Sequence, residues 1–115
     1  MSSKNNINPE LWGGYFWRVF HLTAFGFPDE PTAEDRNIYK NFYINFSQIL
    51  PCNNCAIDAF KKMKDTEWGN ILNSRESLIK WTYDFHKDVN DKLKNCSWDG
   101  LERDLDDLKN KINEE

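Results

Sequence analysis

Apolar residues recur at helical spacing along most of the chain. They follow one another three or four positions apart in segments that begin near residues 9, 32, 52 and 74. This spacing places the apolar side chains on one face of an α-helix. No stretch alternates apolar and polar residues over a useful length, and no segment repeats another. The pattern predicts an all-α protein, a four-helix bundle with a short fifth helix at the C-terminus.

Capping residues and prolines mark the ends of the first two helices. Asn8-Pro9-Glu10 is a helix start with Asn as the N-cap, and this helix is expected to run to Phe27-Pro28. Thr32 is predicted to cap the second helix, which must stop before Pro51. The predicted inward faces contain Trp12, Tyr15, Phe16, Val19, Phe20 and Thr23 on the first helix, and Ile38, Phe42, Phe46, Ile49 and Leu50, broadened by Tyr39, Tyr43 and Ile44, on the second.

The later boundaries follow from similar signals. The third helix is predicted from Cys52 to about Lys64, followed by a loop at 68–70. The fourth begins at a capping box between Asn73 and Glu76, or at a cap on Ser74. Its buried face is predicted to hold Leu78, Ile79, Trp81, Thr82, Phe85, Val89 and Leu93, and the last helix to hold Leu101, Leu105, Leu108 and Ile112. We expect a disordered leader at 1–8 and a single domain at 9–113.

Composition narrows the function classes. The net charge of -4 is spread over charges of both signs, which argues against a nucleic-acid partner and against a membrane surface. No apolar run is long enough to span a bilayer, and no signal peptide is recognisable. Aromatic residues make up 15% of the chain, so the core must consist largely of rings, which also suit a pocket for a flat cofactor.

Two cysteines follow the point where the second helix ends. Cys52 and Cys55 bracket two asparagines directly after Pro51. Thiols at positions i and i+3 on a first helical turn lie on one face, close enough for a disulfide. The unpaired amides and the dipole at a helix N-terminus favour the thiolate, which attacks disulfides, reduces electron acceptors or binds a metal. The Cys-x-x-Cys spacing alone does not choose among these chemistries.

Two further pairs lie on predicted inward faces. Trp17 and His21 are four residues apart on the first helix, and His86 and Asn90 are four apart on the fourth. A histidine on an apolar face is more often a satisfied core residue than a ligand. A zinc-stabilised helical binding module that uses Cys52, Cys55, His21 and His86 stays open as an alternative, although the usual second ligand pair at short spacing is missing. A thioredoxin-like redox site is disfavoured because the βαβ pattern is absent.

Several motifs in a fixed order between residues 12 and 98 together resemble the ERV/ALR family of flavin-linked sulfhydryl oxidases, and most of all its short viral members. They are Trp17-x-x-x-His21, Phe27-Pro28-Asp29-x-Pro31-Thr32, Pro51-Cys52-x-x-Cys55, Trp81 and His86-x-x-Val89-Asn90-x-Lys92-Leu93. The resemblance implies a helical bundle that holds FAD beside the dithiol. It also implies an FAD-linked thiol oxidase that forms disulfides in other proteins and passes the electrons to O2, which gives H2O2.

The resemblance assigns roles to individual residues. Cys55 corresponds to the cysteine next to the flavin, and Cys52 to the outer cysteine that meets the substrate. The cofactor-binding set that it implies is Gly13, Gly14, Trp17, His21, Cys55, His86, Val89, Asn90 and Lys92, with no metal ligand. The implied partners are a thiol-containing protein or a shuttle dithiol protein, and a second copy of the chain in a homodimer built on the first two helices.

The sequence departs from the family pattern at three places. Tyr83 stands where many members have a cysteine, so Cys96 has no evident partner. No additional dithiol lies in 1–51 or after 96 to act as a shuttle. Lys87 stands where an asparagine is frequent, which puts that cofactor contact in question. The expected location is the host cytoplasm at a site of virus assembly or the virion, with the mitochondrial intermembrane space as the alternative. A helical interaction protein with incidental cysteines is the third hypothesis.

Overall fold

The structure is a computed structural model that describes residues 5–94, with side chains described as far as residue 91. This part of the chain is helical and contains no strand. Its helices are α1 (Pro9–Phe25), α2 (Ala33–Gln48), α3 (Asn53–Lys64), α4 (Trp68–Ile71) and α5 (Arg75–Lys94). In the described residues, no helix combines the length and the apolar character that crossing a membrane requires.

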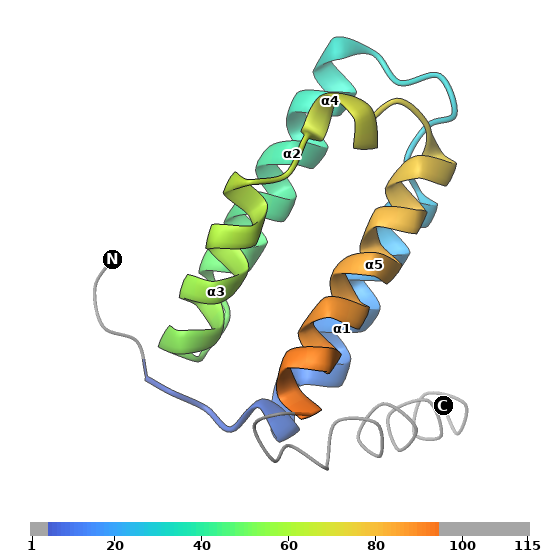
Figure 1. Cartoon of the computed structure of the whole chain (residues 1–115). Helices are drawn as coiled ribbons and strands as arrows, with labels where there is room; N and C mark the ends of the chain where they lie inside the picture. Colours follow the sequence, from blue (N-terminus) through green and yellow to red (C-terminus); the bar gives the residue numbers. More distant parts are fainter. Residues whose placement is uncertain (1–4, 95–115) are drawn as a thin grey trace, which may run out of the picture.

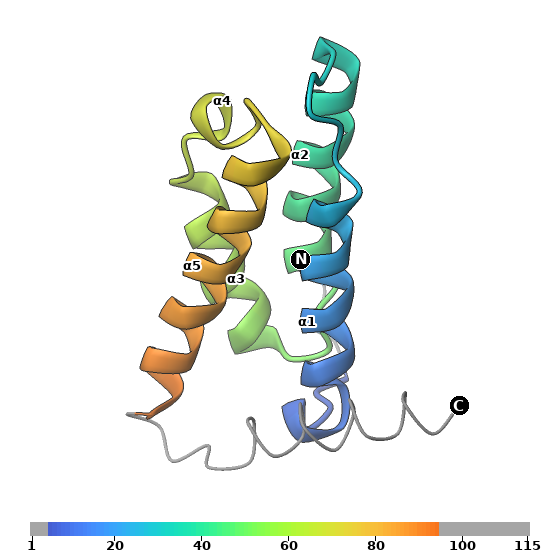
Figure 2. The same cartoon turned by 90° about the vertical axis from the view of Figure 1, so that its right-hand side faces the viewer.

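The four long helices alternate in direction along the chain. In Figure 1, α1 and α3 run upward, whereas α2 and α5 run downward. Contacts join α2 to α3 and α1 to α5, so the bundle consists of two antiparallel pairs, which Figure 1 shows on opposite sides. In the view turned by 90°, α1 and α2 appear on one side and α5 and α3 on the other (Figure 2). The prediction of an all-α bundle is confirmed. The predicted C-terminal helix lies outside the described residues.

Capping fixes the starts of α1 and α2 as predicted. The Asn8 side chain accepts a hydrogen bond from the Glu10 amide, with Pro9 as the first helical residue. Thr32 and Asp35 form a reciprocal capping box, because each side chain accepts from the other residue's amide. Such caps satisfy amides that have no partner within the helix. Both caps join residues two or three positions apart, so local sequence alone specifies where α1 and α2 begin.

Two details between α3 and α5 differ from the prediction. The predicted loop at 68–70 contains the short helix α4, because Trp68 is buried and its Nε1 donates to the Met63 carbonyl at 3.1 Å. The Asn73–Glu76 capping box does not form. Instead, the Ser74 hydroxyl accepts from the Ser77 amide, and the Ser77 hydroxyl accepts from the Ser74 amide. The alternative cap on Ser74 was therefore the right one.

The core is built from rings, as composition predicted. Phe20 is 2% exposed and contacts rings from α1, α2 and α5. Tyr43 is fully buried, and its hydroxyl donates to the Phe20 carbonyl at 3.0 Å, which ties α2 to α1. Ring contacts to Phe20 come from Trp17, Tyr43, Phe46, Trp81 and Phe85. Edge-on and tilted pairs of this kind add to the stabilisation from burial alone.

The predicted inward faces were partly wrong. Ile38 and Ile49 are exposed, because the buried line of α2 passes through Tyr43 and Ser47 instead. On α1, Tyr15 and Val19 also face outward. They belong to a row of exposed large apolar side chains that we call the α1 ridge, formed by Leu11, Tyr15, Val19, Leu22 and Phe25. Apolar residues surround so much of both helices that periodicity could not choose the buried side.

Candidate functional site

Cys52 and Cys55 lie at the N-terminus of α3 and are joined by a disulfide, with 5.3 Å between their Cα atoms. Cys52 is the N-cap residue, and its sulfur accepts a hydrogen bond from the Cys55 amide at 3.3 Å. Both residues are half-buried. A sulfur that already accepts an amide hydrogen bond at a helix N-terminus is well placed to carry negative charge. The predicted redox geometry is therefore present.

The segment before α1 contacts the same end of α3. The Asn6 side chain accepts a hydrogen bond from the Asn53 amide at 2.8 Å, and the Ile7 amide donates to the Pro51 carbonyl at 2.7 Å. The Trp12 indole donates to the Ile7 carbonyl at 2.9 Å. Asn6 and Ile7 fall within the predicted leader at 1–8, and here they hold the turn that carries the disulfide.

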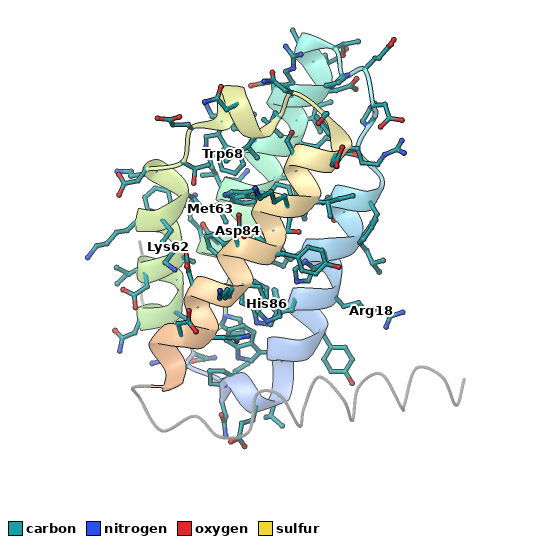
Figure 3. All side chains as sticks on the ribbon, turned by 45° about the vertical axis from the view of Figure 1, so that its right-hand side comes forward. Arg18, Lys62, Met63, Trp68, Asp84 and His86 are labelled. Carbon is teal, nitrogen blue, oxygen red and sulfur yellow. A yellow bond between two sulfur atoms is a disulfide. The ribbon has the colours of Figure 1, made fainter. Side chains whose placement is uncertain are left out.

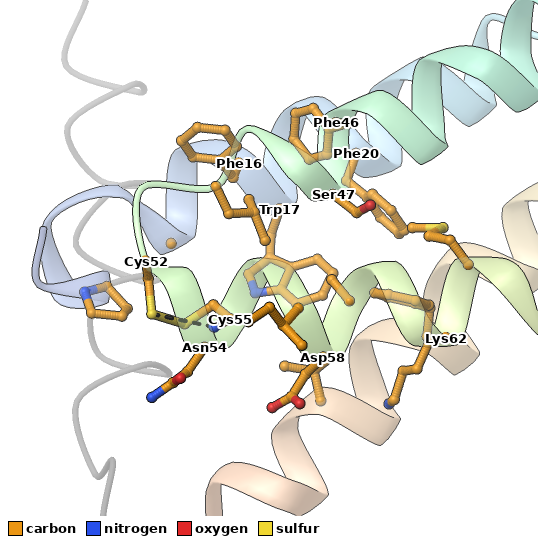
Figure 4. A pocket seen from close by; sticks show the side chains of 18 of the residues that line it. Phe16, Trp17, Phe20, Phe46, Ser47, Cys52, Asn54, Cys55, Asp58 and Lys62 are labelled. Atoms are coloured by element: carbon orange, nitrogen blue, oxygen red, sulfur yellow. Dashed lines mark hydrogen bonds between the residues drawn. A yellow bond between two sulfur atoms is a disulfide. The ribbon is translucent and has the colours of Figure 1, made fainter. Parts of the chain in front are cut away.

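A cavity of about 540 Å³ lies between α3 and the α1–α5 pair, with the disulfide in its wall. Figure 4 shows the rings of Phe16 and Phe46 on one side and the α3 residues Cys55, Asp58 and Lys62 on the other. The size falls in the range of small-molecule sites, roughly 300–1,000 Å³. The aromatic and sulfur-bearing lining includes Trp12, Phe16, Trp17, Phe20, Phe46, Cys52, Cys55, Met63 and Phe85.

Asp58 and Lys62 are the charged side chains in the cavity lining. They lie four residues apart on α3, the spacing that puts two side chains on one helix face. The Lys62 Nζ atom is 5.4 Å from the centre of the Phe85 ring, a cation–π distance. The cavity therefore pairs a largely apolar wall with a cation and a carboxylate on the helix that carries the disulfide.

Three of the predicted cofactor-binding residues meet between α1 and α5. His86 stacks on Trp17 with ring centres 3.9 Å apart and planes inclined by 13°. The His86 Nδ1 atom lies 2.9 Å from His21 Nε2, and His21 Nδ1 lies 3.0 Å from the Thr82 hydroxyl. Figure 3 shows His86 in the space between the two helices. We call Trp17, His21, Thr82 and His86 the histidine cluster.

Burial favours the uncharged form of both histidines. Desolvation lowers the pKa of His21 below its ordinary value of 6.5. Desolvation and, to a smaller extent, the adjacent His21 together lower the pKa of His86 to about 4. The His86 Nε2 atom is buried, and no hydrogen-bond partner for it occurs in the described part of the chain. Such an atom costs free energy unless a bound molecule supplies a partner.

The other predicted site residues are distributed as follows. Gly13 and Val89 line the cavity together with Trp17, Cys52 and Cys55. Gly14 is buried in α1, and Asn90 is half-buried in α5, but neither belongs to the lining. Lys92 lies in α5, and its side chain falls outside the described residues. Lys87 is exposed.

Tyr83, which stands where the family pattern often has a cysteine, is 55% exposed and stacks on His21 with ring centres 4.8 Å apart. Cys96 lies outside the described residues.

The structure does not support the zinc hypothesis. The two histidines contact each other in the histidine cluster, whereas the two cysteines are joined to each other in the cavity wall. Among residues 5–91, no group of three or more histidine, cysteine, aspartate or glutamate side chains could hold a metal ion.

The sequence reasoning did not identify every residue of this region. Thr82 was assigned only to the buried face of its helix, although it lies four residues before His86 and so on the same side of α5. Likewise, Asp58 and Lys62 follow Cys55 at helical spacing on α3. In both cases, the sequence feature that could have identified them is a polar residue at helical spacing from a chemically active one.

Comparison with known proteins identifies relatives of the chain. Residues 15–113 match the family model described as the Erv1 / Alr family. A probable FAD-linked sulfhydryl oxidase of Acanthamoeba polyphaga mimivirus is 41% identical over 87 residues, covering 73% of this chain and 59% of the relative. An FAD-linked sulfhydryl oxidase of African swine fever virus (isolate Pig/Kenya/KEN-50/1950) is 37% identical over 89 residues, covering 76% and 73%.

A solved structure shares the fold. The crystal structure of the yeast Erv1 core matches with a TM-score of 0.70 and 32% sequence identity, covering 82% of this chain and 78% of that one. The chain spans 59% and 60% of the length of two of its viral relatives.

Proposed function

Because the chain belongs to the Erv1/Alr family, we propose that it is an FAD-dependent sulfhydryl oxidase that forms disulfide bonds in substrate proteins. The observation that carries this function is the position of the Cys52–Cys55 disulfide in the wall of a ring-lined cavity. A dithiol next to a flat redox cofactor is the arrangement that two-electron thiol oxidation requires. The helical interaction protein with incidental cysteines leaves this arrangement unexplained.

The residues present fit FAD. A flat, largely apolar ring system suits a cavity lined by aromatic side chains, and the buried, unpartnered Nε2 atom of His86 suits a molecule rich in hydrogen-bonding groups. Cys55, Gly13, Trp17 and Val89 would hold the cofactor from the cavity wall. We propose the remaining contacts for Gly14, His21, His86, Asn90 and Lys92.

The two cysteines carry the thiol chemistry. A substrate thiolate attacks the Cys52 sulfur, the Cys52–Cys55 bond breaks, and Cys55 leaves as a thiolate at the N-terminus of α3. A second substrate thiolate then attacks the mixed disulfide, which releases the oxidised substrate and a reduced Cys52–Cys55 pair. FAD bound beside Cys55 would supply the two-electron acceptor for this pair, with O2 as the final acceptor, which with two protons gives H2O2. The disulfide is thereby restored.

A homodimer is the assembly that we propose. The α1 ridge places five large apolar side chains on the outer face of one helix, each between 47% and 70% exposed. A continuous apolar patch of this kind is typical of an interaction surface. A Leu22→Glu substitution on the ridge is expected to shift the sedimentation coefficient toward the monomer value. Ile57→Glu, at an exposed apolar position on α3, serves as the control.

The other partners and the location follow from the same proposal. The substrate is a thiol-containing protein or a shuttle dithiol protein, because the chain offers one redox disulfide in its described part and accepts thiols through Cys52. The viral relatives favour a virus-encoded protein that works in the host cytoplasm at an assembly site or in the virion. The yeast relatives, which are named as mitochondrial, support the intermembrane space as the alternative.

Oxygen consumption tests the proposed activity. The purified protein is supplied with reduced dithiothreitol or a reduced protein dithiol, and O2, H2O2 and free thiols are measured together. We expect one O2 consumed and one H2O2 formed for each disulfide, by a protein that carries bound FAD. A flavin-free protein that consumes no oxygen with either thiol would rule the proposal out.

A further inference from the structure

The Thr82 hydroxyl is a buried polar group at the centre of the histidine cluster. The residue is 1% exposed and lies on α5, one helical turn before His86. Its Oγ1 atom is 2.7 Å from the Ile79 carbonyl oxygen and 3.0 Å from His21 Nδ1. A hydroxyl has one hydrogen to donate, so these two contacts must differ in direction.

The shorter contact fixes that direction. Two oxygen atoms approach to 2.7 Å only with a hydrogen between them, and a carbonyl has none to give. The Thr82 hydroxyl therefore donates to Ile79. It follows that Thr82 Oγ1 is an acceptor toward His21, and that the His21 Nδ1–H group donates to it.

The donor and acceptor roles of the ring nitrogens of His21 and His86 follow from this hydrogen bond. An uncharged histidine carries one ring hydrogen, so with Nδ1 protonated the His21 Nε2 atom is an acceptor. Its neighbour at 2.9 Å is His86 Nδ1, which must be the donor. The single ring hydrogen of His86 is thereby used, and His86 Nε2 is left as a bare acceptor. This is the buried atom for which the described chain offers no partner.

We infer that Thr82 is a positioning residue, which fixes the tautomers of His21 and His86 so that His86 Nε2 accepts a hydrogen bond from bound FAD. The inference rests on the proposed function. His86 stacks on Trp17, and the Trp17 indole also lines the cavity beside the disulfide, where we propose that FAD binds. FAD carries amino, imide and hydroxyl groups that can donate, so an acceptor at this atom favours binding, whereas an N–H group there would oppose it.

Without the Thr82 hydroxyl, the direction of the hydrogen bonds between His21 and His86 is no longer fixed. Without an acceptor at position 82, His21 Nδ1–H would be buried and unpaired, and the opposite tautomer becomes favourable. In that tautomer His21 Nε2–H donates to His86 Nδ1, and His86 Nε2 carries the hydrogen. The proposed cofactor contact at His86 Nε2 then changes from an acceptor to a donor, although no side chain has moved.

Two substitutions separate this role from simple packing. Thr82→Val keeps the shape and removes the hydroxyl, whereas Thr82→Ser keeps the hydroxyl and removes a methyl group. FAD affinity is measured by the quenching of flavin fluorescence on binding. Nitrogen-15 NMR of labelled histidines in the FAD-loaded protein reports which ring nitrogen carries the hydrogen. We expect Thr82→Val to weaken FAD binding about tenfold, the effect of one buried hydrogen bond, and Thr82→Ser to bind as the wild type does.

The NMR signature is specific to the tautomer. The wild type and Thr82→Ser should show a protonated Nδ1 and an unprotonated Nε2 on both histidines, and Thr82→Val should show the reverse. Equal FAD affinities for the Val and Ser variants, or a protonated His86 Nε2 in the wild type, would overturn the inference while leaving the oxidase proposal intact. If the wild type takes up no FAD, the proposed function fails with it, and the FAD-free spectrum still decides whether Thr82 sets the tautomers.

Discussion

The disulfide and the histidine cluster are built in opposite ways, although both adjoin one cavity. The disulfide is formed by residues three positions apart, is half-buried, and depends on the N-terminus of a single helix. The histidine cluster joins residues 61 and 65 positions apart and depends on the packing of α1 against α5. Under the proposed function the first must stay open to protein thiols, whereas the second is a part-buried contact between two helices.

This difference assigns separate tasks to the two regions. The reactive end owes its chemistry to local features, namely the Cys-x-x-Cys spacing and the helix dipole. The histidine cluster contributes no reacting atom and offers a stacked ring and one buried acceptor instead. Substitutions at the two regions should therefore have separable effects on turnover and on cofactor affinity.

The largest effect is expected from Cys55→Ser. Removing the thiol that transfers electrons should lower thiol-dependent oxygen consumption at least about 1,000-fold, as the loss of a reacting side chain does in other enzymes. Bound FAD per chain should stay nearly the same, because serine keeps the shape of Cys55 in the cavity wall and the cavity rings and the histidine cluster are unchanged. Cys96→Ser is the control, with activity unaltered. Loss of FAD together with activity in Cys55→Ser would show that the two regions are not separable.

His86→Ala should have the next largest effect, on cofactor affinity. The substitution removes the stack on Trp17 and the buried acceptor, so FAD should bind about 10- to 100-fold more weakly in a fluorescence titration. Anaerobic reduction of the Cys52–Cys55 disulfide by dithiothreitol should proceed at the wild-type rate. Lys87→Ala, at the exposed neighbouring position, should change neither quantity. A faster or slower disulfide reduction in His86→Ala would contradict the comparison.

Acid should destabilise the bundle through the histidine cluster. In the unfolded chain His86 takes up a proton near pH 6.5, whereas in the folded chain its pKa is about 4. Between these values the unfolded state binds more protons, so the free energy of unfolding falls as the pH falls from 6.5 to 4. Urea unfolding at several pH values should show a shallower fall for His86→Gln than for the wild type. Parallel curves for the two proteins would exclude His86 as the source.

The smallest effect is expected from Tyr43→Phe, at a fully buried core residue outside both regions. The substitution removes the buried hydrogen bond to the Phe20 carbonyl and should lower the free energy of unfolding by about 0.5–1.5 kcal/mol. Denaturant unfolding measures this change. FAD affinity and oxygen consumption should be unaltered at a temperature where the variant is folded, and a change in either would extend the functional site into the core.

Much of the fold was predictable because its signals are local. The caps at Asn8 and Thr32 and the disulfide geometry at 52–55 depend on residues two or three positions apart. The inward faces of α1 and α2 were harder, since apolar side chains such as Leu22 and Ile38 also cover the outside. The hydrogen bonds from Thr82 through His21 to His86 were beyond prediction, because they exist only once α1 and α5 are packed at a particular rotation and register.

An anaerobic titration of the purified protein with dithiothreitol tests the central claim most directly. The account predicts flavin absorption bands in the visible spectrum that bleach as electrons pass through Cys52 and Cys55, and that return when air is admitted. In Cys55→Ser, the same bands should be present and should resist bleaching over the same period. Flavin bands that bleach equally fast in Cys55→Ser, or a colourless wild-type protein, would contradict the account.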